Sequence, residues 1–268
     1  MKTYQYPEYT DMHYIEKKKI KDIVFDENYP YIDNSFSFKF KRLFVRLGLR
    51  LIVFPFCRIK LGLKIEGREK LKRNKHIIDK GVISCCNHVH MWDYICIMKA
   101  IRPKMPYFLS WKDNITGESG GLVRLVGGIP IPDDNLKGMR KYNETIENLL
   151  NNGGWLHIYP EGSMWEYYDH IRPFKRGLAY MAIKYDKPIL PLGIKYRKSS
   201  FIARKLFRRE YSFTLCIGDL IFRNKTLNKK MMEEDLTKRC HMAVCNLAGI
   251  DYKNNGYEPI FNNSKRIF

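Results

Sequence analysis

The chain has 268 residues, of which 45% are hydrophobic and 14% aromatic, as expected for a globular protein with a substantial core. Its 48 Lys and Arg residues against 28 Asp and Glu give a formal net charge of +20. This excess favours acidic partners: an anionic membrane surface, a phosphorylated substrate or nucleic acid. No uncharged stretch approaches the roughly 20 residues that a transmembrane helix needs, which argues against a membrane-spanning protein.

The seven cysteines form no metal-binding or redox motif, because their number is odd, Cys85 and Cys86 are adjacent, and no Cys-x-x-Cys occurs. Reduced thiols in a cytosolic protein are the simplest interpretation. The polar and charged N-terminus lacks the apolar core of a signal peptide. We expect residues 1–35 to form a loosely organised extension that packs on the domain.

Residues 36–60 form a second segment, which begins with the pattern of an amphipathic helix over residues 36–56. Its basic residues fall within one narrow arc of a helical wheel: Lys39, Arg42, Arg46 and Arg50. Such a helix is expected to lie in a membrane interface, its arginines on lipid phosphates. The alternative is a helix that covers the core with its arginines in water. Pro55 is expected to end or kink it.

The rest of the chain, residues 61–268, alternates short apolar runs with amphipathic ones. Strands are expected at residues 59–66, 81–86, 107–111, 155–159, 188–194, 213–217 and 220–222. Helices are expected at residues 91–100, 122–126, 136–151, 178–185 and 231–248. The basic residues 195–209 are expected to form an exposed loop or a hairpin limb. This alternation predicts an α/β fold, a mixed sheet flanked by helices.

His88 and Asp93 are the first candidates for a catalytic pair. His88 follows an apolar strand, and Asp93 falls in the first turn of the next expected helix, where the helix dipole favours a carboxylate. The carboxylate can then fix the imidazole tautomer, while the other ring nitrogen takes a proton from a hydroxyl. The spacing alone also fits an ordinary loop pair, and both interpretations stay open at this point.

Four short blocks follow one another along the chain. They are residues 87–93 (Asn-His-Val-His-Met-Trp-Asp), 128–131 (Gly-Ile-Pro-Ile), 159–163 (Tyr-Pro-Glu-Gly-Ser) and 188–191 (Pro-Ile-Leu-Pro). Phe-Lys-Arg-Gly follows the third block at residues 174–177. In these blocks the chain resembles the glycerolipid acyltransferases, the family of lysophosphatidic acid acyltransferases, whose first and third blocks read Asn-His-x4-Asp and Phe-Pro-Glu-Gly-Thr. The resemblance covers about residues 62–219 and implies a glycerol-3-phosphate acyltransferase-like domain.

The resemblance implies an O-acyltransferase of phospholipid biosynthesis. It would move a fatty acyl group from a thioester of coenzyme A or acyl carrier protein to a lysophospholipid hydroxyl, above all that of 1-acyl-glycerol-3-phosphate. His88 would be the general base, and Asp93 would hold its tautomer and stabilise the imidazolium. No acyl-enzyme, metal or cofactor beyond the acyl donor is implied.

The resemblance also implies which residues bind the substrates: Glu161, Gly162, Ser163, Gly128, Ile129 and Pro191. Lys175 and Arg176 follow the third block and are candidates for binding phosphate; the alternative is two solvated cations. The expected setting is the cytoplasmic face of a membrane, with a peripheral or monotopic protein that contacts anionic lipids and not nucleic acid.

The chain departs from the family at two arginines associated with the acceptor's phosphate. Pro132 and Asp133 follow the second block where an arginine is usual, and Met164 replaces the arginine after the third. An acceptor without a free phosphate is therefore the alternative. Otherwise another cation must take their place in space: Arg124, Arg140, Arg172 or Lys175.

Two more distant interpretations use the same residues. His88, His90 and Asp93 resemble part of a metal-hydrolase ligand cluster, although the other histidines supply no recognisable further ligands. A basic, aromatic-rich protein could also bind anionic lipid or nucleic acid without catalysis. The four blocks would then have no explanation.

Overall fold

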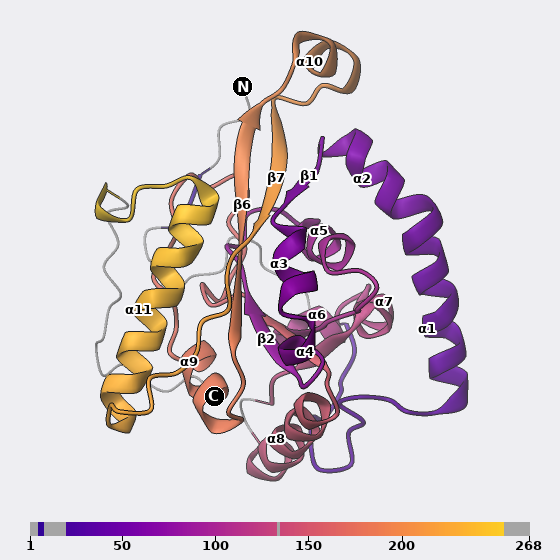
Figure 1. Cartoon of the computed structure of the whole chain (residues 1–268). Coiled ribbons are helices and arrows are strands. Elements are labelled where there is room, and N and C mark those ends of the chain that lie inside the picture. The colour runs from indigo at the N-terminus through magenta and orange to yellow at the C-terminus, as the bar shows by residue number, and fades with distance from the viewer. Residues whose placement is uncertain (1–4, 8–19, 133–134, 255–268) are drawn as a thin grey trace.

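The computed structural model describes residues 5–7, 20–132 and 135–254. Residues 1–4 and 8–19 of the extension expected at residues 1–35, and Asp133 after the second block, lie outside the described residues. Figure 1 shows a central sheet with helices on both sides. Within the described ranges, no helix combines the length and apolar character needed to cross a bilayer.

Seven strands form one sheet in the order β1-β7-β6-β2-β5-β3-β4. The strands are β1 (Lys64–Glu66), β2 (Val82–Cys85), β3 (Tyr107–Ser110), β4 (Gly128–Pro130), β5 (Trp155–Ile158), β6 (Ile189–Lys198) and β7 (Tyr211–Ile217). Only β6 and β7 pair antiparallel, and the other neighbours are parallel. The predicted mixed sheet is therefore confirmed. The strand expected at residues 220–222 is only an isolated bridge between Ile221 and Ile189.

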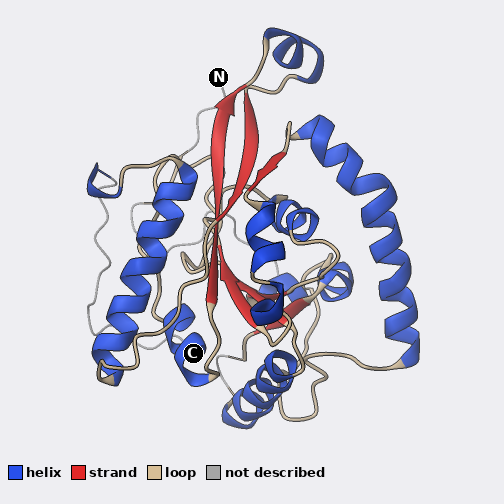
Figure 2. Cartoon of the chain, in the orientation of Figure 1, coloured by secondary structure: helices blue, strands red, loops and turns tan. Residues whose placement is uncertain are grey.

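Helices cover both faces of this sheet (Figures 1 and 2). The α-helices are α1 (Phe36–Gly48), α2 (Phe54–Lys60), α3 (Arg68–Arg73), α4 (Lys75–Ile78), α5 (Asp93–Ala100), α6 (Lys112–Thr116), α7 (Gly120–Val126), α8 (Leu136–Asn151), α9 (Gly177–Lys184), α10 (Phe201–Phe207) and α11 (Lys229–Ala248). Helices α9 and α11 lie on one side, and α3 and α5 on the other, with α1 outermost. The alternation read from the sequence thus gives the predicted flanking helices.

Strand β2 explains why the central strands read as continuous apolar runs. Side chains of a strand alternate between the two faces of the sheet. Ile83 and Cys85 belong to the core beneath α9 and α11, whereas Val82 belongs to the core beneath α5. Because both faces are covered, every position of β2 is buried. This places the chain that follows β2 at the end of a rigid strand.

Helix α1 packs against the protein with its basic face, which the sequence pattern directed toward lipid phosphates or water. Arg42 is only 7% exposed, and its guanidinium lies 4.2 Å from the ring centroid of Tyr107 and donates to the Tyr107 hydroxyl. The aromatic face and hydroxyl of Tyr107 offer that cation both a ring contact and an acceptor. The expectation that Arg42 reaches lipid phosphate or water is therefore wrong. Large apolar residues of this region face outward instead: Phe36, Phe40, Leu43, Phe44, Leu47, Leu51 and Ile52.

The helix also runs through Pro55, which was expected to end or kink it. Residues Leu49–Val53 form a π-helix, and the Phe54 amide bonds to the Leu49 carbonyl five residues back. Pro55 has no N–H and crowds the carbonyl four residues before it, and a π turn is one way to make room. Helix α2 then continues to Lys60, so the strand expected at residues 59–66 is shortened to β1.

Candidate active site

Three of the four blocks meet at the carboxyl end of β2. Strand β5, which leads to the third block, pairs with β2 on one side, and β6, which contains the fourth, pairs on the other. The carboxyl ends of parallel strands meet at one edge of a sheet, where sites of α/β proteins are commonly built. Pro191 of the fourth block lies opposite Cys85. The second block lies further away, on β4 beyond β5 and β3.

His88 and Asp93 are in direct contact. The His88 Nδ1 lies 2.7 Å from Asp93 Oδ2, and the Asp93 side chain is 0% exposed while that of His88 is 23% exposed. The same oxygen accepts the amide of Val89 at 3.1 Å. Because a carboxylate only accepts, Nδ1 must carry the proton and Nε2 is left with a lone pair. This is the arrangement a general base requires.

Tyr159 completes the surroundings of this pair. Its hydroxyl donates to Asp93 Oδ1 at 2.7 Å, and its ring stacks on that of His88 with centroids 3.8 Å apart and an interplanar angle of 11°. Burial and the Asp93 carboxylate raise the pKa of Tyr159 well above its usual value, so its hydroxyl remains a donor. The sequence reasoning did not assign Tyr159 a role, although its place in the third block was a usable signal.

Asp93 remains ionised in spite of its burial. Burial acts to raise its pKa, but the charge and hydrogen bond of His88 and the hydroxyl of Tyr159 outweigh that effect. The pKa of Asp93 therefore lies below its usual value. An ionised carboxylate is the form that can stabilise an imidazolium next to it.

Asn87 fixes the first block to the sheet. Its side-chain amide donates to the Ile194 carbonyl at 3.1 Å and its oxygen accepts the Ile194 amide at 2.8 Å. The residue before His88 is thus held by the backbone of β6. No separate role was predicted for Asn87, which was only part of the first block, because its partner lies 107 positions further along the chain.

A buried ion pair holds the third block. Arg172, with a fully buried side chain, lies 2.6 Å from the Glu161 carboxylate and donates to Ser163 Oγ at 2.7 Å. The Trp165 ring lies 4.5 Å from the same guanidinium. Burial raises the pKa of Glu161, although the charges of Arg172 and His88 oppose that rise. Arg172 thus fixes Glu161 and Ser163 of the third block, and the charge of His88 acts on the Glu161 carboxylate.

Residues 62–195, half of the chain, match the model of the acyltransferase family. The chain belongs to the acyltransferase family. This confirms the family predicted from the four blocks. The structure resembles the crystal structure of the 1-acyl-sn-glycerophosphate (LPA) acyltransferase PlsC from Thermotoga maritima. The match has a TM-score of 0.48 and 14% sequence identity, over 81% of this chain and 90% of that chain. No curated protein matches the chain.

The four cations named as replacements for the missing arginines occupy different places in this acyltransferase. Arg124 donates to the Pro30 carbonyl, and the exposed Arg140 pairs with Glu144 on α8. Among the described residues, neither makes a hydrogen bond or ion pair with the four blocks, and Arg172 is held by Glu161. Lys175 is left as the candidate nearest to the third block.

Lys175 lies against the loop that carries Gly162. The Lys175 amide donates to the Pro160 carbonyl at 2.8 Å. A Cβ built on Gly162 would lie 2.8 Å from the Lys175 ammonium, and the φ of Gly162 is +82°, so only glycine suits this position. Arg176 points elsewhere, with its guanidinium 3.9 Å from Glu234 of α11.

The remaining residues predicted to bind substrate are buried in the sheet. Gly128 and Ile129 lie on β4, whose three positions are all buried, and Ile129 is part of the core. Pro191 is buried on β6. Their roles in substrate binding stay predictions.

His90 and the two cysteines near the site have partners of their own. The His90 Nδ1 accepts the Trp92 amide at 3.0 Å, so this nitrogen is not directed at His88. Cys85 and Cys86 are fully buried, and burial raises the pKa of both thiols well above the usual value. In the described part of the chain, no three His, Cys, Asp or Glu side chains are grouped to hold a metal ion.

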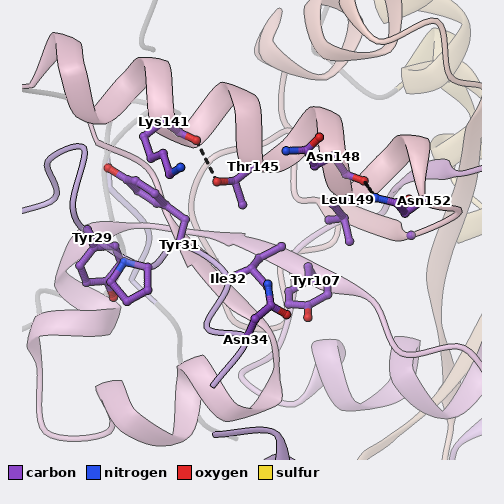
Figure 3. Close-up of a pocket in the computed structure, with 12 residues that line it drawn as sticks. Tyr29, Tyr31, Ile32, Asn34, Tyr107, Lys141, Thr145, Asn148, Leu149 and Asn152 are labelled. Atoms are coloured by element: carbon purple, nitrogen blue, oxygen red, sulfur yellow. Dashed lines mark hydrogen bonds between the residues drawn. The ribbon is translucent and has the colours of Figure 1, made fainter. Parts of the chain in front are cut away.

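A cavity of about 410 Å³ lies apart from these blocks, between residues 29–34, Tyr107 and α8 (Figure 3). Two of its polar side chains bond to the helix itself: Thr145 donates to the Lys141 carbonyl and Asn152 to the Asn148 carbonyl. None of the four blocks lines it. The candidate active site is therefore the His88–Asp93 pair and not this cavity.

Proposed function

We propose that the protein transfers a fatty acyl group from an acyl-coenzyme A or acyl carrier protein thioester to the hydroxyl of a lysophospholipid, with 1-acyl-glycerol-3-phosphate as the favoured acceptor. The observation that carries this proposal is the His88–Asp93 pair at the meeting point of three family blocks. Family membership supports acyl transfer, and the exposed edge of the His88 ring supports its role as base.

The proposed reaction uses the lone pair on His88 Nε2. Nε2 takes the proton of the acceptor hydroxyl while that oxygen attacks the thioester carbonyl carbon. The tetrahedral intermediate then expels the thiolate: the C–S bond breaks, the ester forms, and the imidazolium returns the proton to sulfur. Asp93 stabilises the imidazolium between the two steps. No oxidant, metal or acyl-enzyme enters this sequence.

Lys175 is the proposed contact for the acceptor's phosphate. Its ammonium lies beside Gly162, next to the ion-paired Glu161. A single ammonium can bind phosphate as a point charge, but it lacks the bidentate geometry of an arginine. An acceptor with a phosphodiester headgroup or an uncharged one remains the second candidate, because the two family arginines are absent.

The acceptor is a lipid, and we propose that α1 brings the domain to an anionic membrane surface on its cytoplasmic face. The outward face of α1 is apolar, with Phe36 85% exposed and Phe40 and Phe44 about half exposed. An apolar face of this kind is stable when buried at the boundary between headgroups and acyl chains. Arg50 and Lys39 are exposed and available to lipid phosphates.

Thiol release from acyl-coenzyme A with lysophosphatidic acid tests the reaction. His88→Ala is expected to lower kcat/KM by about 10²–10⁴-fold, the usual value of a general base. His170→Ala is a matched control, because His170 also lies 2.7 Å from a carboxylate, that of Asp169, but is exposed. The control is expected to keep full activity. Full activity of His88→Ala would overturn the mechanism.

A screen of acceptors tests the substrate. Lysophosphatidic acid should outperform lysophosphatidylcholine and monoacylglycerol, and Lys175→Ala should raise KM for lysophosphatidic acid alone. Equal rates with all three acceptors, or an unchanged KM, would transfer the proposal to an acceptor without a free phosphate. Absence of thiol release with every acceptor and both carriers would reject acyl transfer.

A further inference from the structure

Helix α10, at the tip of the β6–β7 hairpin, exposes an apolar surface that the acyl-transfer proposal does not use. Its large apolar residues are all exposed, between 47% and 70%: Phe201, Ile202, Leu206 and Phe207. Only Ala203 of this helix is buried. Figure 1 shows α10 projecting beyond the body of the molecule, above β6 and β7. Soluble monomers rarely leave such a cluster in water.

The same tip is strongly basic. Residues 195–209 contain seven Lys or Arg and no Asp or Glu. Four of these cations are exposed and near α10: Lys198, Arg204, Lys205 and Arg208. Within the described part of the chain, none of these four cations forms an ion pair, whereas Arg197 and Arg209 donate to backbone carbonyls. The tip therefore presents unpaired positive charge next to its apolar side chains.

Hydrogen bonds join the hairpin to the end of α2. Arg209 donates to the Ile59 carbonyl, Arg197 donates to the Gly62 carbonyl at 2.6 Å, and the Phe213 amide donates to the Leu61 carbonyl at 2.9 Å. Ile59 is itself about half exposed. The end of α2 thus lies against the base of the hairpin whose tip is α10, at one end of the molecule (Figure 1).

We propose that α10 is a second membrane contact, which inserts its apolar side chains into a bilayer rich in anionic phospholipid. The inference rests on the proposed function in one respect, since a lipid acceptor has to be drawn from a bilayer. Apolar side chains flanked by Lys and Arg fit the boundary between acyl chains and anionic headgroups. The long basic side chains can keep their charges at the phosphates while the helix lies deeper.

Two contacts would orient the domain, because one helix alone leaves it free to rotate about the helix axis. The α1 face and the α10 tip lie on different elements, and hydrogen bonds join the end of α2 to the base of the hairpin. Binding by both would multiply their separate affinities through effective concentration. Loss of either contact should therefore weaken binding by the full chain considerably.

Co-sedimentation of the full chain with vesicles tests the proposal. The vesicles are phosphatidylcholine alone, or phosphatidylcholine with about one third phosphatidylserine, an anionic lipid of the kind that attracts basic segments. Phe201→Ser/Leu206→Ser should lower the partition coefficient on the anionic vesicles at least ~10-fold, since two apolar side chains no longer insert. Arg204→Glu/Lys205→Glu should lower it by a similar factor on anionic vesicles and little on neutral ones.

Matched controls lie on α11, on the side of the sheet opposite to α1 (Figure 1). Met231→Ser removes an exposed apolar side chain, and Lys230→Glu/Lys238→Glu makes the same change in net charge at exposed positions. These variants should bind like the wild type. If they lose as much binding as the α10 variants, net charge and not α10 explains the affinity, and the proposal fails.

Variants of the two contacts separate this inference from the proposed function. Normal binding by the α10 variants, with binding lost in Phe40→Ser/Phe44→Ser, would overturn the role of α10 and leave that of α1. Thiol release with a soluble short-chain acceptor reports the chemistry independently of either contact. A dimer of the wild type that Phe201→Ser/Leu206→Ser converts to monomers, with vesicle binding unchanged, would make the tip a self-association surface and also overturn the proposal.

A fluorescent label gives a second measurement that does not depend on loss of binding. All seven native cysteines are buried, so Ile202→Cys creates a selectively labelled site. An environment-sensitive label there should shift to shorter wavelength with anionic vesicles, while the same label on Lys238→Cys should not. No shift at position 202 while the protein is bound would overturn insertion of α10.

Discussion

Asp93 is held at both of its carboxylate oxygens, and the donors come from two separate parts of the chain. Its Oδ2 accepts from the neighbouring first block, and its Oδ1 accepts the hydroxyl of Tyr159 at the end of β5. A carboxylate fixed at both oxygens cannot rotate away from His88. The orientation of the His88 ring therefore depends on the pairing of β2 with β5 as well as on the first block.

Removal of the Tyr159 hydroxyl should change the pH dependence of the reaction. Tyr159→Phe keeps the ring that stacks on His88 but leaves Asp93 Oδ1 without this donor. A carboxylate that loses a donor stabilises an adjacent imidazolium more strongly. We expect the acidic limb of the kcat/KM profile to move to higher pH, with a loss of about 1 kcal/mol in the free energy of unfolding.

Tyr185→Phe serves as the control, because the Tyr185 hydroxyl bonds Asn143 away from the site. Its pH profile should be unchanged. A merely structural role for Tyr159 would lower stability and leave the acidic limb in place. That result would contradict a positioning role for the hydroxyl.

Removal of one partner of the Arg172–Glu161 ion pair should lower the free energy of unfolding strongly. Arg172→Met leaves an uncompensated carboxylate at Glu161, which is buried with an exposed fraction of 2%. We expect a loss of about 3–5 kcal/mol in the free energy of unfolding, measured by urea denaturation. Glu161→Gln added to Arg172→Met should recover part of it. Additive losses in the double variant would show that the two side chains are not coupled.

The sequence allowed the His88–Asp93 pair to be predicted because both residues lie within one short strand-to-helix connection. Tyr159, Arg172 and Asn87 have partners on other strands or loops, and their contacts depend on which strands are neighbours. Periodicity carries no information about that order. The third block placed Tyr159 near the site, but only the sheet shows that its hydroxyl reaches Asp93.

At the scale of elements, α1 shows what a helical wheel can and cannot predict. The basic arc and the apolar surface are present as predicted, but the wheel does not say which face meets the protein. Tyr107 decides this, since Arg42 stacks on its ring. The π turn before Pro55 was not predicted either, because it continues the helix past a proline that was expected to end or kink it.

Arg42 should therefore contribute to stability more than its neighbours on the same arc. We expect Arg42→Ala to lower the free energy of unfolding by about 1–3 kcal/mol through the lost hydrogen bond and ring contact. Arg50→Ala, at an exposed position of the π turn, should change it by less than about 0.5 kcal/mol. Urea denaturation of both variants measures the difference. Equal losses in the two variants would mean that Arg42 does not pack on Tyr107 in solution.

At the scale of the whole molecule, the alternation of apolar runs was sufficient to predict a mixed α/β sheet with flanking helices. Helix α10 was not predicted, because a basic run is typical of a solvated loop. The antiparallel β6–β7 hairpin was expected only as one of two forms of residues 195–209, an exposed loop or a hairpin limb. Its register, from Leu192 opposite Ile217 to Lys198 opposite Tyr211, extends the sheet beyond the body of the domain. Long-range pairing of this kind leaves only a weak signal in one sequence.

His157, which is buried in the sheet, makes the stability of the whole molecule depend on pH. Its Nδ1 lies 2.8 Å from Ser84 Oγ, which also accepts the Trp155 indole N–H at 2.7 Å. The Ser84 hydroxyl, which accepts from Trp155, keeps its own proton to donate to the Nδ1 of a neutral His157. Burial lowers the pKa of His157 to about 3, from about 6.5 in an unfolded chain.

The unfolded chain therefore binds a proton at this histidine between about pH 6.5 and pH 3, while the folded chain does not. The contribution of His157 to stability is complete above about pH 6.5 and is lost as the pH falls toward 3, by on the order of 4 kcal/mol. His157→Asn keeps an acceptor for Ser84 but does not titrate. Urea denaturation at a series of pH values should give a flatter dependence for this variant between pH 6.5 and 4, whatever constant loss its smaller side chain causes. His76→Asn, at an exposed histidine, should keep the wild-type slope, and an unchanged slope in His157→Asn would show that His157 is protonated in the folded protein.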